Sequence, residues 1–252
     1  MTLIDIELSA PVNLRDLGGI PIEGGTLRQG LAIRTDDLAY VTEEVADKLV
    51  ADGLTALIDL RSPLEVATTG RGPLASRPVT YHHLPLIADV SETMSEGAPS
   101  FTHESMGAMY VSMVESAAPQ LVTALNVIAH TRGATAFHCA AGRDRTGVLA
   151  AMLLLTLGAD DDEIVADYAR TGENMEAIFT RSRPVMGAMW EALGSERSLD
   201  DTRALLDGQM HVSARILLAQ LRERHGDALA PLRTAGLSDD TIARLRERAR
   251  VA

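Results

Sequence analysis

Apolar residues recur along the chain in two kinds of pattern, and their alternation predicts an α/β fold. Three short, mostly apolar runs, 54–60, 79–86 and 135–138, have the length of buried strands. A helical pattern precedes the first run, because Thr42 can cap a helix that Gly53 ends. Strands separated by helical segments indicate a sheet that is at least partly parallel.

The second half of the chain is almost entirely helical in pattern. A long apolar helix is predicted over 146–157, directly after the third strand and a turn that contains glycine. Four further helices are predicted at 160–170, 173–193, 199–225 and 238–250. Their arginines, including Arg181 and Arg183, are expected on solvated faces. We expect one domain, 1–252, with a central, mostly parallel sheet of four to five strands flanked by helices and a largely helical C-terminal half.

The stretch 88–105 has the weakest pattern and is rich in Ser, Glu, Gly and Pro, so we predict a loop. The next segment, 106–114, carries methionines and a tyrosine at helical spacing. Two interpretations stay open. Either 88–118 is a lid or mobile insertion within the domain, or the helix turns an ordinary apolar stripe toward the core.

Composition narrows the class of protein and its partners. The 252 residues are 46% hydrophobic and 23% charged, which is typical of a globular chain with a substantial core. The net charge of −12 argues against a nucleic-acid-binding face. Because no stretch approaches 18 apolar residues and 1–7 lacks a basic leader, we expect no stable membrane insertion and a cytoplasmic protein by default. Export without a signal peptide and the oligomeric state stay open.

The segment 138–147, HCAAGRDRTG, carries the candidate chemistry. Cys139 is the only cysteine, so it forms neither an internal disulfide nor a Cys-rich zinc site. At the N-terminal end of the predicted helix, unpaired N–H groups and the helix dipole favour negative charge and thus a thiolate. Arg145 can give two parallel hydrogen bonds to phosphate oxygens. The small residues between them can turn their N–H groups inward around an anion: Ala140, Ala141 and Gly142.

This string resembles the signature loop of the cysteine-dependent phosphatases, which is Cys, five residues, Arg, then Ser or Thr. In detail it is similar to the bacterial tyrosine and lipid phosphatases typified by mycobacterial protein-tyrosine phosphatase B. Further segments are similar in order and spacing: 13–19, 58–62 with Glu65, 167–168 and 225–238. One departure is Arg143, where that family commonly has lysine, which keeps the charge and changes its reach.

The resemblance implies roles for the residues of the loop. Cys139 would attack phosphorus to form a cysteinyl-phosphate, while Arg145 and the loop N–H groups hold the phosphate oxygens. Thr146 either donates to the departing thiolate or satisfies the helix start. His138 is expected to hydrogen-bond the loop backbone from beneath. We expect neither a metal nor a cofactor.

Two aspartates compete for the role of general acid. Asp144 lies inside the loop, and the resembling family assigns the role to that position. Asp89 follows the second predicted strand, in the kind of loop that supplies the acid in ordinary tyrosine phosphatases. We favour Asp144.

Two other polar motifs have alternative interpretations. Asp59 and Arg61, at a strand end, either support the phosphate loop from behind or form a surface ion pair. Asn13, Arg15 and Asp16, before two glycines, are expected to fix a turn rather than to touch substrate.

We therefore predict a cysteine-dependent phosphatase with phosphotyrosine as its leading substrate. The resemblance implies that phosphoserine, phosphothreonine and phosphoinositides are also accepted. Because Arg143 can hold a second phosphate group, a phosphoinositide phosphatase is the alternative. A catalytically inactive pseudophosphatase that binds phosphorylated partners, and a sulfur transferase of rhodanese type, are alternatives from other classes.

Overall fold

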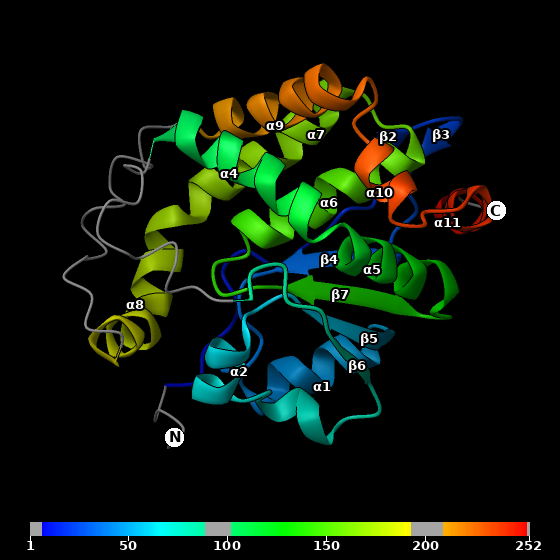
Figure 1. Ribbon diagram of the computed structural model, residues 1–252. Coiled ribbons are helices and arrows are strands. Elements are labelled where there is room, and N and C mark those ends of the chain that lie inside the picture. Colours follow the sequence, from blue (N-terminus) through cyan, green and yellow to red (C-terminus); the bar gives the residue numbers. More distant parts are fainter. Residues whose placement is uncertain (1–6, 89–101, 193–208, 251–252) are drawn as a thin grey trace.

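The computed structural model describes residues 7–88, 102–192 and 209–250. In these residues a five-stranded sheet lies between two unequal layers of helices (Figure 1). The strands follow the order β1 (Arg15–Asp16), β4 (Ala32–Thr35), β7 (Ala134–His138), β5 (Leu54–Asp59) and β6 (Thr80–His83). Neighbours are parallel except for β1, which pairs with β4 in the antiparallel sense. The predicted α/β fold with a mostly parallel sheet of four to five strands is thus confirmed.

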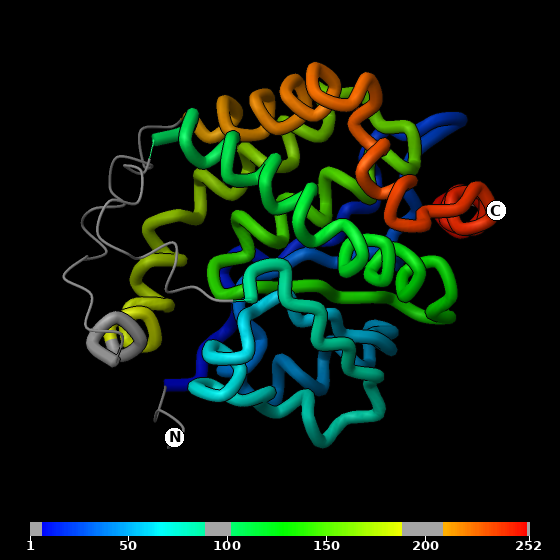
Figure 2. The backbone as a smooth tube through the Cα atoms, viewed as in Figure 1, coloured from blue at the N-terminus to red at the C-terminus, as the bar shows by residue number. Residues whose placement is uncertain are grey.

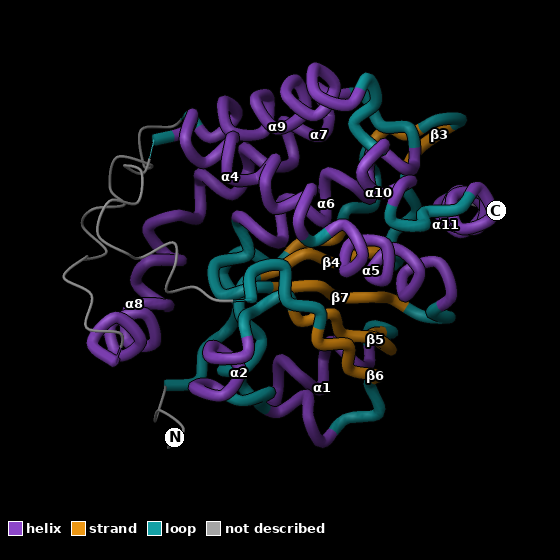
Figure 3. Tube along the Cα trace, viewed as in Figure 1, coloured by secondary structure: helices purple, strands orange, loops and turns teal. Residues whose placement is uncertain are grey.

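Helices cover both faces of the sheet, and the described C-terminal half is largely helical (Figures 1 and 3). The thinner layer contains α1 (Glu43–Ala51), α2 (Pro63–Thr69) and the 3-10 turn η1 (Pro73–Ser76). The thicker layer contains α4 (His103–Ser116), α5 (Ala118–His130), α6 (Asp144–Leu157), α7 (Asp161–Ala169), α9 (Met210–His225), α10 (Ala230–Thr234) and α11 (Asp239–Ala249). The turn η2 (Arg170–Asn174) leads into α8 (Met175–Ala192), which lies on the side toward which β4 and β7 point (Figure 1).

The central strand β7 carries the site. All five of its residues are buried, because β4 and β5 flank it and helices cover both faces, and this explains its apolar sequence. His138, its last residue, is in register with Thr35 of β4 and Asp59 of β5. Three strands therefore end level with one another, and the chain leaves the sheet at Cys139.

The helix after this strand, α6, begins at Asp144, two residues earlier than predicted, and stops at Gly158 in the left-handed conformation. Nearly all of α6 is buried, since it packs against α4, α5, α7 and α11. This burial explains why its sequence is apolar all round rather than on one face. The early start places Asp144 and Arg145 in the first turn of the helix.

Helix α4 turns Met106, Tyr110 and Met113 into the core and packs along α9. Its apolar stripe is thus buried, while 89–101, the first part of the predicted lid, lie outside the described residues. Within the described ranges no single helix has the length and apolarity to cross a membrane. The pair α4 and α5, bent by 78°, meets that test only when the two helices are joined.

A small hairpin, β2 (Pro21–Ile22) and β3 (Gly25–Thr26), lies on the same side of the molecule as the last helix, α11, whereas the N-terminal end of the described chain lies on the opposite side (Figure 2). The N–H of Arg28 donates to the carbonyl of Ala249 (2.8 Å), and Arg246 pairs with Glu23 (2.6 Å). These contacts join the first strands to the last helix.

Several boundaries differ from the predictions. Strand β6 ends at His83 instead of continuing to 86, because Pro85 has no N–H to extend the ladder. Helix α9 begins at Met210, and 199–208 of its predicted range lie outside the part of the chain that the structure describes. The structure also contains β4, α2, α5 and α10, at which the sequence pattern predicts no helix or strand.

Candidate active site

The loop between β7 and α6 turns its carbonyl oxygens outward into the surrounding protein. Four hydrogen bonds hold them. The donors are Asp37 N to Ala140 O (3.1 Å), Asn13 Nδ2 to Ala141 O (3.3 Å) and to Gly142 O (3.1 Å), and Arg34 Nη2 to Gly142 O (2.9 Å). In a trans peptide the C=O and the following N–H point in opposite directions. The N–H groups of Ala141, Gly142 and Arg143 therefore face the inside of the loop, and no described residue accepts a hydrogen bond from them.

Gly142 is required by this conformation. Its φ is +66°, in the left-handed region. A Cβ at this position would lie 2.5 Å from the carbonyl oxygen of Thr35 and 2.6 Å from the N–H nitrogen of Asp36. Both are backbone atoms, which cannot swing away as a side chain would.

Cys139 and Arg145 stand at the two ends of the loop. Cys139 is buried. The Arg145 guanidinium makes two parallel bonds to Glu65, Nη1 to Oε2 (2.5 Å) and Nη2 to Oε1 (2.8 Å). Burial alone would lower the pKa of Arg145, but the charges of Glu65 and Cys139 outweigh it and raise the pKa above its usual value. Arg145 is thus a fully charged group that Glu65 holds in a fixed orientation.

Glu65 is itself fixed by the start of α2. Its Oε2 accepts from the N–H of Ser62 (2.6 Å), and its own N–H donates to Ser62 Oγ (3.3 Å), which is a capping box. Burial opposes its ionisation, but Arg145 and these hydrogen bonds keep the pKa of Glu65 below its usual range. The cap of α2 therefore orients the arginine of the loop.

Beneath the loop, Asp167 of α7 bridges two buried arginines. It accepts from Arg15 Nε (2.9 Å) and from Arg34 Nη1, and Arg34 has no exposed surface. Burial opposes ionisation of Asp167, yet Arg34 and Arg15 hold its pKa below the usual value. Since Arg34 also donates to the Gly142 carbonyl, this ion-pair bridge supports the loop directly.

In the N-terminal motif, Asp16 has a different structural role from Asn13 and Arg15. Asp16 fixes a turn as predicted, because it accepts from the N–H groups of Gly18 (2.7 Å) and Gly30 (2.6 Å). Asn13 and Arg15 do not serve that turn. Asn13 holds two loop carbonyls, and Arg15 Nη1 donates to Asn13 Oδ1 (2.6 Å) and so orients it.

A second buried network lies behind Cys139. The surface ion pair considered for Asp59 and Arg61 is wrong, because these residues are 0% and 1% exposed. Arg61 pairs with Asp59 (2.5 Å) and Asp37 (2.9 Å). His138 lies 3.6 Å from Asp37 Oδ1 and 3.8 Å from Asp59 Oδ2, and its Nδ1 donates to the Cys139 carbonyl (3.3 Å).

The pKa values in this network diverge. Burial raises the pKa of Asp37 in spite of Arg61. For Asp59, the attraction of His138 and Arg61 overcomes burial and lowers the pKa. Asp59 is thus the firmly ionised member of the pair.

The side chains of Arg143 and Thr146 differ in whether they are hydrogen-bonded. Arg143 folds back so that its Nε donates to Asp144 Oδ1 (2.8 Å), and its side chain is 9% exposed. Thr146 Oγ1 is buried and finds no hydrogen-bond partner among the residues described. The hydroxyl is therefore not engaged in capping the helix. Asp89, the alternative acid, lies outside the described residues.

Arg181 is a correction to the expectation of solvated arginines. Its side chain is 6% exposed, pairs with Asp36 (2.6 Å) and lies over the ring of Tyr40 at 4.1 Å. Since Asp36 also accepts from the N–H of Asn13 (2.9 Å), α8 is connected through Arg181 to the segment that holds the loop. A solvated position for Arg181 is wrong because the Asp36 carboxylate and the Asp37 carbonyl, which directly follow β4, both accept from its guanidinium.

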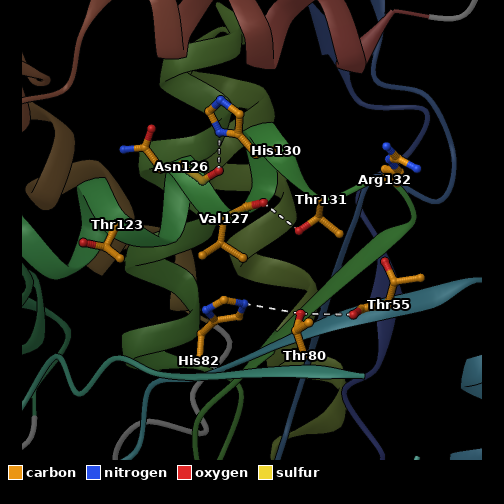
Figure 4. Close-up of a pocket in the computed structure, with 9 residues that line it drawn as sticks. All are labelled: Thr55, Thr80, His82, Thr123, Asn126, Val127, His130, Thr131 and Arg132. Atoms are coloured by element: carbon orange, nitrogen blue, oxygen red, sulfur yellow. Dashed lines mark hydrogen bonds between the residues drawn. The ribbon is translucent and has the colours of Figure 1, made fainter. Parts of the chain in front are cut away.

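A pocket of about 540 Å³ lies at the opposite end of the sheet (Figure 4). Its lining residues are Thr55, Thr80, His82, Thr123, Asn126, Val127, His130, Thr131 and Arg132. Thr55 and Thr80 lie at the amino ends of β5 and β6, whereas the loop follows the carboxyl end of β7. Several of the lining side chains bond to one another or to nearby carbonyls. Within the described ranges, no three His, Cys, Asp or Glu side chains are grouped to hold a metal ion.

A mostly parallel sheet whose central strand is followed by a buried cysteine, a loop with inward N–H groups and an arginine fixed by Glu65 form an arrangement suited to hold an anion. The chain belongs to the tyrosine phosphatase family, whose sequence profile matches residues 6–250. The predicted family is thus confirmed, and the protein is a tyrosine phosphatase, a phosphoric monoester hydrolase.

Two relatives illustrate the match. A tyrosine-protein phosphatase of Nostoc commune is 31% identical over 219 residues, which cover 86% of this chain and 73% of that protein. The triple specificity protein phosphatase PtpB of Mycobacterium tuberculosis is 27% identical over 271 aligned positions, which cover 95% of this chain and 97% of PtpB.

Proposed function

We propose that the protein hydrolyses phosphotyrosine through a cysteinyl-phosphate intermediate. The observation that carries the proposal is the set of outward carbonyls at Ala140, Ala141 and Gly142, which leaves the intervening N–H groups facing the space between Cys139 and Arg145. Fixed donors of this kind stabilise charge on phosphate oxygens without reorganising during the reaction. A thiolate at the same place supplies the nucleophile.

In the first step the thiolate of Cys139 attacks phosphorus, the bond from phosphorus to the tyrosine oxygen breaks, and Asp144 gives its proton to that oxygen. In the second step water attacks phosphorus and transfers a proton to the Asp144 carboxylate. The bond from sulfur to phosphorus then breaks and inorganic phosphate leaves. Thr146, whose buried hydroxyl has no partner among the described residues, donates to the departing thiolate.

Phosphorylated protein is the preferred substrate class in this proposal. The residue suited to a second phosphate group is Arg143, and its guanidinium is occupied by Asp144 and largely buried. A phosphoinositide preference is therefore the second candidate. The mycobacterial relative is named a triple specificity phosphatase. We extend that breadth to this chain as the proposal that it also accepts phosphoserine and phosphothreonine.

The test compares wild type and Cys139→Ser on a phosphotyrosine peptide, a phosphoserine peptide and a set of phosphoinositides. We expect release of phosphate from the phosphotyrosine peptide, and its loss in Cys139→Ser. Full activity of Cys139→Ser would refute the thiolate mechanism. Binding without turnover by folded wild type would identify a pseudophosphatase, and cyanide-dependent turnover of thiosulfate would identify a sulfur transferase.

The role of the acid is tested separately. We expect Asp144→Asn to lower kcat for a peptide phosphate by about 10²- to 10⁴-fold, the usual effect of losing a general acid. Near-full activity of that variant would transfer the role to Asp89.

A further inference from the structure

Two buried tyrosines from different helices reach the side chain of Asp144. Tyr110 of α4 donates its O–H to Asp144 Oδ1, and the hydroxyl oxygens of Tyr110 and Tyr168 of α7 lie 2.6 Å apart. A phenol has one hydrogen to donate. Because Tyr110 gives its hydrogen to Asp144, Tyr168 must be the donor to Tyr110. The chain of donors therefore runs from Tyr168 to Tyr110 to Asp144.

Both tyrosines are held in place as neutral donors. Their side chains are 1% and 5% exposed, and their rings meet edge to face with centroids 5.9 Å apart. Burial, followed by the nearby charge of Asp144, raises the pKa of Tyr168 to about 12 and that of Tyr110 well above its usual value. Neither hydroxyl ionises at neutral pH, so the order of donors is kept.

Gly147 allows this arrangement. A Cβ at Gly147 would lie 2.8 Å from Cδ2 and Cε2 of Tyr168, so only a residue without a side chain lets that ring lie against the first turn of α6. The same turn carries Asp144. The contact of ring and helix sets the position of the Tyr168 hydroxyl relative to the acid.

The hydrogen bonds to Asp144 are all on one oxygen. Within the described part of the chain, Tyr110 and Arg143 (Nε, 2.8 Å) both donate to Oδ1. The carboxyl group can carry its proton on Oδ2, since Oδ1 is already occupied by two donors. A carboxyl group fixed at one oxygen cannot rotate freely, and its other oxygen has a defined direction.

We propose that Tyr110 and Tyr168 are positioning residues that hold Oδ1 of Asp144 and so direct Oδ2 toward the leaving oxygen of the substrate. The proposal rests on the proposed function, in which Asp144 is the general acid. It explains why two tyrosines are buried with their hydroxyls hydrogen-bonded in series. Phenylalanine would pack as well at either position and would need no hydrogen-bond partner.

The test uses the dependence of rate on the leaving group. The ratio kcat/KM reports phosphoryl transfer to Cys139 and departure of the leaving group, and so excludes hydrolysis of the intermediate. Phenyl phosphate releases a phenol of pKa about 10, as tyrosine does, and needs a proton. 2,4-Dinitrophenyl phosphate releases a much more acidic phenol and does not.

We expect Tyr110→Phe to lower kcat/KM for phenyl phosphate by about tenfold, a part of the effect of losing the acid, and for dinitrophenyl phosphate by less than about threefold. Tyr168→Phe should act in the same direction with a smaller loss, and it carries the test if Tyr110→Phe does not fold. The matched control is Thr156→Val, which removes a buried hydroxyl that bonds Met152 O (2.7 Å) at the far end of α6.

Asp144→Asn, measured in parallel, distinguishes a failure of this inference from a failure of the proposed function. If Asp144→Asn shows the leaving-group dependence and Tyr110→Phe lowers both rates equally or neither, the tyrosines do not position the acid. If Asp144→Asn itself shows no such dependence, the assignment of the acid in the proposed function fails and this inference fails with it. Support requires that Tyr110→Phe add no further leaving-group dependence in the Asp144→Asn background.

Discussion

Replacing Glu65 by glutamine tests how the structure orients Arg145. The Glu65 carboxylate accepts three N–H groups on two oxygens, two from Arg145 and one from Ser62. Glutamine has one oxygen and one NH₂ group. If its oxygen takes the place of Oε2, it keeps Ser62 and one N–H of Arg145, and its NH₂ then faces the other N–H of Arg145. The substitution thus keeps the shape, removes the charge and sets two donors against each other.

The magnitude follows from this count. One hydrogen bond to a charged group contributes about 1.5–3 kcal/mol. The substitution also removes the counter-charge of Arg145, whose side chain is 11% exposed. Together, these two losses should lower the free energy of unfolding by about 3 kcal/mol. For a chain of this size each kcal/mol shifts Tm by about 2–4 °C, so Tm should fall by about 6–12 °C. With Arg145 free to turn, kcat/KM should fall by about 10- to 100-fold.

The assay is thermal unfolding with and without orthovanadate, together with kcat/KM for a phosphotyrosine peptide. Vanadate should raise the Tm of Glu65→Gln less than that of wild type, because an arginine that is free to turn holds the anion more weakly and the stabilisation by a ligand falls with its affinity. The control is Glu115→Gln, which removes a carboxylate that is 32% exposed and pairs with His225 (2.9 Å); its cost should stay below about 1 kcal/mol. A Tm within about 2 °C of wild type, with unchanged activity, would refute the reasoning.

Three further substitutions test the support of the loop. Gly142→Ala should abolish phosphatase activity and destabilise the fold by about 2 kcal/mol or more, because it combines a left-handed φ with backbone clashes, as activity and urea unfolding would show. Asn13→Ala should weaken vanadate inhibition by about tenfold and destabilise the fold by about 1–3 kcal/mol, since two buried carbonyls lose one donor and Arg15 loses an acceptor; equal inhibition would contradict this. Asp167 has a folded-state pKa below its unfolded value, so its contribution to stability is full above about pH 5 and is lost as pH falls through the folded pKa. Asp167→Asn should therefore flatten the acid limb of a plot of unfolding free energy against pH, and an unchanged limb would count against the ion-pair bridge.

The loop between β7 and α6 was predictable because its signals are local. Cysteine, small residues, arginine and the following apolar helix lie within 138–157, and a strand, turn and helix in that order leave few arrangements. The same holds for β5, whose apolar run between Gly53 and a polar end specifies both its length and its burial.

The support of the loop was not predictable, since it consists of long-range contacts between charged residues. Arg34 is fully buried in a strand of four residues, and sequence patterns place arginine at the surface. Glu65 belongs to the capping box at the start of α2, and nothing nearby in the sequence shows that its carboxylate also binds Arg145. Tyr110 fits the apolar stripe of α4, and only the fold shows where its hydroxyl points. A polar group at the end of a core side chain gives no periodic signal.

The bridge at Asp167 has a consequence for how the enzyme is made. Its partners Arg15 and Arg34 are 152 and 133 residues away in the chain, and both leave the ribosome long before it does. Until α7 emerges, Arg34 has no carboxylate to hold it beneath the Gly142 carbonyl. A nascent chain that ends after α6 would already contain the cysteine, the aspartate and the arginine of the loop. We expect it to have no phosphatase activity, so that activity during synthesis begins only when residue 167 can dock.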